Sequence, residues 1–150
     1  MTFLCVSSFA QSPLKQFKKL SPPEKCWVFA HPFIAKKAFK LTKSIEADVD
    51  SLKKTGTIGT DNNGGMLDAF KHAYWMATLT QRFGSRRSLK LGRAHEKANR
   101  IQFEKRELEE SILPDSVSSE MDLRNNSSGA LLVKKKECVS LKDLQLRVIQ

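Results

Sequence analysis

Apolar side chains occupy almost every side of the helix predicted over residues 66–83, which leaves the chain few ways to fold. One face of this helix carries Leu67, Phe70, Ala73, Tyr74 and Ala77, and another carries Trp75, Met76 and Leu79. A helix with so little polar surface has to be enclosed by other elements. We therefore predict that it lies at the centre of the fold.

Amphipathic helices are predicted around this central one. A helix begins at the capping box of residues 21–24 and is interrupted at Pro32, so that His31 is interpreted as a helix-junction residue. The next helix has an apolar stripe at spacings of three and four, formed by Ile34, Ala38, Leu41, Ile45, Val49 and Leu52. Further helices are predicted over residues 85–112, after a cap at Ser118 or Ser119, and after Ser140. The predicted fold class is an all-α, compact single-domain bundle of about five to six helices.

The two ends of the chain have their own patterns. Residues 1–10 resemble the end of a truncated signal peptide, because a short apolar run reaches a small-x-small site at residues 8–10. The usual basic start is missing, so a buried N-terminal strand stays an alternative. Residues 21–130 are predicted to form the helical domain, and residues 131–150 a basic tail with a short terminal helix. Export would place the protein in the periplasm, on the outer envelope or in the medium.

The cysteines and the hydropathy of the sequence exclude some structural zinc motifs and a transmembrane helix. Removal of residues 1–10 would leave Cys26 and Cys138, which could form one disulfide or remain two buried thiols. The sequence has no Cys-x-x-Cys pair, which removes the usual structural zinc motifs. No stretch approaches the ~20 apolar residues of a transmembrane helix.

Charge points to acidic partners. The net charge is +10, with 26 basic and 16 acidic residues. Such an excess favours contact with anionic lipid, a cell-envelope polymer or another acidic partner, although it can also serve solubility alone. The basic residues are spread over several helices without interleaved aromatics, which disfavours nucleic-acid binding.

Two polar clusters lie on predicted helices. Asp68 and His72 are four residues apart, so the carboxylate can orient the imidazole one turn away, as in a general base. His95 and Glu96 lie near the middle of the 85–112 helix, and His95 is in line with its apolar stripe. These four residues are the candidate catalytic residues.

A third cluster lies near residues 122–129. Asp122, Asn126 and Gly129 share one helix face, with Asn125 beside it. Asparagine costs ~0.5 kcal/mol relative to alanine in a helix, so the pair suggests a specific task for the amides. Because buried unpaired polar groups cost ~1–3 kcal/mol each, we predict that the three clusters meet in one pocket. The structural alternative is that these side chains only satisfy one another and fix helix register.

The same residues carry a resemblance to a known family. Residues 68–75 read Asp-Ala-Phe-Lys-His-Ala-Tyr-Trp, residues 94–96 Ala-His-Glu, and residues 121–129 Met-Asp-Leu-Arg-Asn-Asn-Ser-Ser-Gly. Occurring in this order, they resemble an uncharacterised bacterial all-helical domain family, a domain of unknown function, over about residues 27–129. The resemblance implies an exported or envelope domain and no particular activity. Arg124 stands where this family often has histidine, which implies one potential ligand or proton carrier fewer.

Two functions fit these patterns. The first is a hydrolase in which His72 acts as general base, with or without a divalent metal. The residues that would bind a metal or substrate are His95, Glu96, Asp122, Asn125 and Asn126, with Tyr74 and Trp75 as further ligand-binding candidates that could equally be core. The second is a non-catalytic envelope-associated binding or structural protein with a buried polar network. Motifs of the common hydrolases, metalloproteases and nucleotide-binding folds are missing from the sequence.

Overall fold

The computed structural model describes residues 17–59, 65–110 and 116–150, and the side chains of 106–110 and 116–118 are not considered. Within these ranges the structure is helical except for turns, loops and an isolated bridge between Thr57 and Gly59, which confirms the all-α prediction. Counting the helical residues 17–19, the described ranges contain seven helices, slightly more than the five to six predicted. The predicted signal peptide at residues 1–10 and residues 60–64 of the predicted loop lie outside this description.

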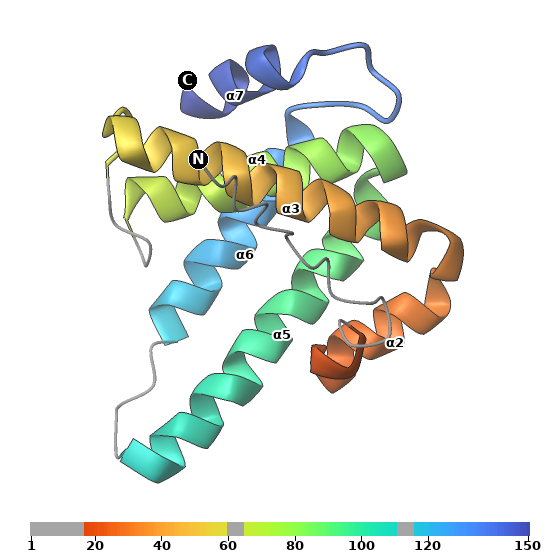
Figure 1. Ribbon diagram of the computed structural model, residues 1–150, viewed down its shortest axis with the longest axis vertical. Helices are drawn as coiled ribbons and strands as arrows, with labels where there is room; N and C mark the ends of the chain where they lie inside the picture. Colours follow the sequence, from red (N-terminus) through yellow and green to blue (C-terminus); the bar gives the residue numbers. More distant parts are fainter. Residues whose placement is uncertain (1–16, 60–64, 111–115) are drawn as a thin grey trace, which may run out of the picture.

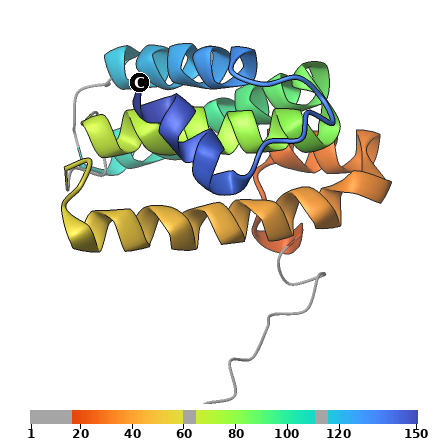
Figure 2. The same cartoon turned by 90° about the horizontal axis from the view of Figure 1, so that it is seen from above.

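Helix α4 (Met66–Phe83) is the centre of the fold, as predicted. Twelve of its residues are buried, which few single helices achieve without neighbours on every side. In Figure 2 it lies between α3 (Pro32–Thr55) and α6 (Ser116–Leu131), and α7 (Leu141–Ile149) crosses it. Helix α5 (Ser85–Glu110) also packs against it. The buried side chains of α4 are therefore packed against its neighbouring helices.

Helices α2 (Pro22–Ala30) and α3 form where the sequence predicts them. The Ser21 hydroxyl accepts a hydrogen bond from the Glu24 amide, and the Ser21 amide donates to the Glu24 carboxylate, completing the capping box. The chain breaks at His31 before Pro32. Ala38, Ile45 and Val49 of the predicted stripe are buried, and the stripe places α3 against α4.

Helices α5 and α6 run back along one another, as Figure 1 shows at the lower left. Their side chains bring the polar clusters toward α4. Helix α6 begins at Ser116, earlier than the predicted cap at Ser118 or Ser119; helix ends are the least certain feature of a sequence pattern. The predicted cap at Ser140 is present, since its hydroxyl accepts from the Asp143 amide at 3.1 Å.

A glycine permits the closest crossing of the fold. A Cβ atom on Gly129 of α6 would lie 2.1 Å from the carbonyl oxygen of Ala73 on α4. Backbone atoms cannot move aside as a flexible side chain can. Only glycine therefore allows α6 to approach α4 this closely.

The cysteine predictions are both wrong. Cys26 and Cys138 are unpaired and exposed, because one lies on the outer side of α2 and the other in the loop before α7. Neither a disulfide nor a buried thiol contributes to the described fold. None of the helices described is both long enough and apolar enough to cross a membrane.

Candidate functional site

The three predicted polar clusters meet around the imidazole of His72. Its Nε2 lies 3.6 Å from Asp68 Oδ1 and 3.4 Å from Asp122 Oδ1. Its Nδ1 lies 3.6 Å from Glu96 Oε1. Helices α4, α5 and α6 thus each present carboxylate or imidazole groups to one point, and Gly129 permits this by letting α6 come close.

The cluster is largely shielded from water. The side chains of His72, Asp68 and Glu96 are 5%, 6% and 4% exposed, whereas that of Asp122 is 13% exposed. Asp122 therefore forms the edge of the cluster nearest to solvent.

Two amides hold the Glu96 carboxylate. Asn126 Nδ2 donates to Oε1 and Asn99 Nδ2 donates to Oε2, both at 3.2 Å. The amide of Asn126 thus has the specific task that its place in a helix suggests, and its Oδ1 has no hydrogen-bond partner within the described ranges. Asn125 is half-buried beside this face, because the next residue along a helix points about 100° away.

Negative charge dominates the cluster. Lys71 is the nearest cation, and its Nζ donates to Asp68 Oδ1 at 2.9 Å. Burial, followed by the charges of Glu96 and Asp68, raises the pKa of Asp122 to about 6. Burial also lowers the pKa of His72, and it outweighs the opposing charges of Glu96 and Asp68. Asp68, Glu96 and Asp122 therefore face an imidazole that is neutral at neutral pH, and Lys71 is paired with Asp68.

The contacts around His72 are longer than charge-assisted hydrogen bonds. Ring nitrogen to carboxylate hydrogen bonds are ~2.7–2.9 Å long when charge-assisted, and contacts of 3.6 Å do not qualify. Within the described part of the chain, His72 Nδ1 has no hydrogen-bond partner. Donors bound ~2.1 Å from a tetrahedral ion, however, lie about 3.4 Å apart. The distances from His72 Nε2 to the two aspartate oxygens are close to this value, and the donor atoms of all three residues lie within 4.8 Å of one another.

Glu96 lies where a supporting carboxylate would stand. It faces Nδ1 of His72, while the two aspartates face Nε2. In metal sites, a carboxylate on the far nitrogen fixes the tautomer that leaves the other nitrogen free to bind the ion. The arrangement can thus hold a cation through Asp68, His72 and Asp122, with Glu96 orienting the ring.

His95 makes its hydrogen bond outside this cluster. Its Nδ1 donates to Glu24 Oε1 at 3.2 Å, and its ring meets the Trp75 ring edge-on. Adjacent residues of a helix point in directions about 100° apart, so His95 and Glu96 cannot both face His72. Here Glu96 does so, and His95 links α5 to the capping box of α2.

Tyr74 and Trp75 also lie away from the cluster. The Tyr74 hydroxyl donates to Asp48 Oδ2 at 3.0 Å, and burial together with Asp48 raises its pKa to about 12. Trp75 Nε1 donates to the Thr42 hydroxyl at 2.8 Å. Both aromatic residues hold α4 against α3, which agrees with the core interpretation.

Arg124 points away from the cluster. Its side chain is 77% exposed and its Nη2 donates to Glu120 Oε1 at 2.8 Å. The arginine at this position therefore removes no ligand from the cluster around His72.

Sequence reasoning missed two neighbours of the cluster, Lys71 and Asn99. Each lies three residues after a predicted site residue, Asp68 or Glu96, on the same helix face. The i,i+3 spacing could have identified both.

The Glu24–His95 pair predicts a pH-dependent stability. Burial alone would lower the pKa of His95, but the hydrogen bond to Glu24 and the charges of Glu96 and Glu24 outweigh it and raise that pKa above 6.5. For Glu24, the hydrogen bonds to His95 and Ser21 outweigh burial and lower the pKa below 4.5. The contribution of His95 is complete below pH 6.5 and is lost as pH rises through its raised pKa. That of Glu24 is complete above pH 4.5 and is lost as pH falls through its lowered pKa.

We therefore expect His95→Gln to cost more stability near about pH 5.5 than near about pH 8.5, by less than about 1 kcal/mol because the ring is partly exposed. Urea unfolding at both pH values measures the difference. In a Glu24→Gln background the pH dependence should become smaller, because the charge of Glu96 remains to oppose burial. An equal cost of His95→Gln at both pH values would contradict the pair's role.

Comparison with known proteins identifies one family. The sequence model of a family described as a domain of unknown function (DUF6973) matches residues 25–150. This confirms the resemblance to a family of uncharacterised domains, and the match continues past residue 129 to the last residue. No curated protein and no solved structure gives a match. The function has to be argued from the site itself.

Proposed function

The chain belongs to the DUF6973 family of domains of unknown function, and we propose that it is a metal-dependent hydrolase whose ion is held by Asp68, His72 and Asp122. The observation that carries the proposal is the spacing of 3.4 and 3.6 Å from His72 Nε2 to the two aspartate oxygens. These separations exceed the ~2.7–2.9 Å of charge-assisted hydrogen bonds and suit donors around one ion. Mixed nitrogen and oxygen donors favour a first-row divalent ion such as Zn²⁺ or Mn²⁺.

Three protein ligands leave a coordination position open. Catalytic metal sites keep such a position for water, whose pKa the ion lowers toward neutrality. Asp122, the most exposed of the three ligands, marks the side from which water and substrate would enter. In this proposal His72 is a ligand and not the general base, because both ring nitrogens already face carboxylates.

The substrate class follows from charge. A protein of net charge +10 attracts phosphodiesters, phospholipids and anionic cell-wall polymers. The apolar run at residues 1–10 supports export to the envelope, where these substrates occur. We propose that the protein acts there.

The alternative is a non-catalytic binding or structural protein. The amide hydrogen bonds to both oxygens of Glu96 favour it, because they would also serve a buried polar network. In that case metal would not bind, or would bind without turnover.

Metal content distinguishes these readings. We expect metal-free protein titrated with Zn²⁺ or Mn²⁺ to bind one equivalent, and Asp122→Asn to weaken binding by about tenfold or more. The matched control is Asp50→Asn, which makes the same change at an exposed position of α3 and should bind as the wild type does. Binding that Asp122→Asn leaves unchanged would place the ion elsewhere and overturn the proposal.

Turnover is measured on the same proteins. The loaded wild type should hydrolyse a diester such as bis-(p-nitrophenyl) phosphate, phospholipid vesicles or cell-wall material, and chelation should abolish the activity. Stoichiometric metal without hydrolysis of any of these would favour the binding protein.

A further inference from the structure

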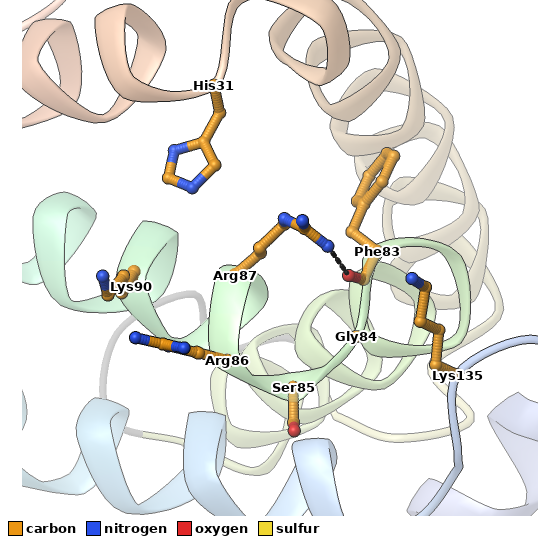
Figure 3. Close-up of a pocket in the computed structure, with 8 residues that line it drawn as sticks. All are labelled: His31, Phe83, Gly84, Ser85, Arg86, Arg87, Lys90 and Lys135. Atoms are coloured by element: carbon orange, nitrogen blue, oxygen red, sulfur yellow. Dashed lines mark hydrogen bonds between the residues drawn. The ribbon is translucent and has the colours of Figure 1, made fainter.

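A hollow lies at the C-terminal end of α4, away from the cluster around His72. Its volume is about 470 Å³, and Figure 3 shows three separate parts of the chain around it. His31 comes from the α2–α3 junction, Arg86, Arg87 and Lys90 from the start of α5, and Lys135 from the loop before α7. Twelve residues of helix separate His72 from Gly84, a rise of roughly 18 Å, so the hollow is distinct from the proposed metal site.

The lining of this hollow is strongly basic. It contains four permanently charged side chains and His31, and no acidic residue. Among the residues that the structure describes, none of these four cations forms an ion pair with a carboxylate. Like charges gathered this closely repel one another. Arg86 and Arg87 also occupy the first turn of α5, where the helix dipole disfavours cations.

Contacts with neighbouring residues hold two of the basic side chains, Arg87 and Lys135, in position. Arg87 Nη1 donates to the Phe83 carbonyl at 3.4 Å, which turns the guanidinium toward the hollow in Figure 3. A Cβ atom on Gly84 would lie 3.2 Å from Lys135 Cδ, so the lysine stem rests on this glycine. The loop that carries Lys135 is fixed by two hydrogen bonds from Gln81 Nε2, to the carbonyls of residues 137 and 139. Arg87 and Lys135 are therefore preorganised.

We propose that this hollow binds the phosphate group of an anionic ligand. Two guanidinium groups and two ammonium groups from one face suit phosphate oxygens, which arginine binds through paired hydrogen bonds. The volume lies in the range of small-molecule sites and exceeds what an inorganic phosphate needs. The phosphate is therefore one carried on a larger body, either a soluble phosphate ester or a phospholipid headgroup.

An exposed aromatic residue distinguishes the two sources. Phe33 follows His31 by two residues, and 91% of its surface is exposed. If the phosphate belongs to a lipid, an apolar side chain beside the headgroup site adds to membrane binding. If the phosphate ester is soluble, Phe33 should not matter.

The test uses the full chain, free of added metal, with two probes. Glycerol 3-phosphate is titrated by calorimetry, and vesicles of phosphatidylcholine containing phosphatidylglycerol are tested by co-sedimentation. The pocket variant is Arg86→Gln with Lys90→Gln, and the matched control is Lys36→Gln with Lys54→Gln, which removes the same charge from exposed positions of α3. We expect the pocket variant to lose about tenfold or more in affinity and the control to lose much less.

The outcomes distinguish a soluble phosphate ester from a lipid headgroup, and both from no phosphate site. Selective loss of glycerol 3-phosphate binding supports a soluble ester. Selective loss of vesicle binding in the pocket variant, together with weaker vesicle binding in Phe33→Ser, supports a lipid headgroup. Equal losses in pocket variant and control, or no binding of either probe by the wild type, overturn the proposal. Metal binding at Asp122 should be unaffected by Arg86→Gln with Lys90→Gln, so the two sites fail or succeed separately.

Discussion

Replacing Gly129 with alanine is expected to destabilise the folded protein by about 3 kcal/mol, the upper end of the range for overpacked positions. The new Cβ atom would lie 2.1 Å from the backbone carbonyl oxygen of Ala73, and 2.7 Å from two further backbone atoms of that residue. Relief requires α6 to move away from α4. That movement would also separate Asp122 from His72.

Whether Gly129→Ala lowers or raises the free energy of unfolding tests the close crossing of α6 on α4. Without a close crossing, alanine would stabilise a helix by ~1 kcal/mol relative to glycine. Urea unfolding followed by circular dichroism measures the change, with Ser128→Ala as the control because Ser128 is exposed on the same helix. Ser128→Ala should change stability by less than about 0.5 kcal/mol. A stabilised Gly129→Ala variant would contradict the crossing of α6 on α4.

The helical spacing in the sequence predicts much of this site. Asp68 and His72 share a face of α4, and Asp122 and Asn126 share a face of α6. An apolar helix such as α4 is surrounded by its neighbours. Polar side chains that these helices turn toward α4 are therefore expected to contact one another. The convergence of Asp68, His72, Glu96 and Asp122 is therefore visible before the fold is known.

The rotation of each helix about its axis is not visible in the sequence. His95 and Glu96 are neighbours in one motif, and only the packing of α5 against α2 decides that His95 meets Glu24, 71 residues away. The partners of Tyr74 and Trp75 on α3 likewise depend on how two helices align. The basic hollow escaped prediction for the same reason, since His31, Arg87 and Lys135 meet only in the folded chain.

Neutralising Asp122 should have opposite effects on the metal-free and the metal-loaded protein. In the metal-free protein, burial and the charges of Glu96 and Asp68 raise the pKa of Asp122 to about 6, so the folded state favours its neutral form. At about pH 7.5 the ionised carboxylate is therefore a cost, and Asp122→Asn should leave stability equal or raise it. Loss of a purely structural hydrogen-bond partner would instead destabilise the protein.

The loaded protein should behave in the reverse way. A ligand that binds only the folded state at 100 times its Kd adds ~2.7 kcal/mol of stability, which for a domain of this size is a rise in Tm of roughly 5–10 °C. Wild type and the Asp50→Asn control should both show this rise on addition of Zn²⁺ or Mn²⁺, and Asp122→Asn, with binding weaker by about tenfold or more, should show about half of it or less.

Thermal unfolding with and without metal therefore gives four Tm values whose pattern separates the two functions. A metal centre requires that added metal raises the Tm of the wild type more than the Tm of Asp122→Asn. A polar network without a metal requires that the difference in Tm between wild type and Asp122→Asn is the same in both conditions. Because Asp68, Glu96 and Asp122 converge on a neutral imidazole, the charge balance of the cluster favours the first pattern.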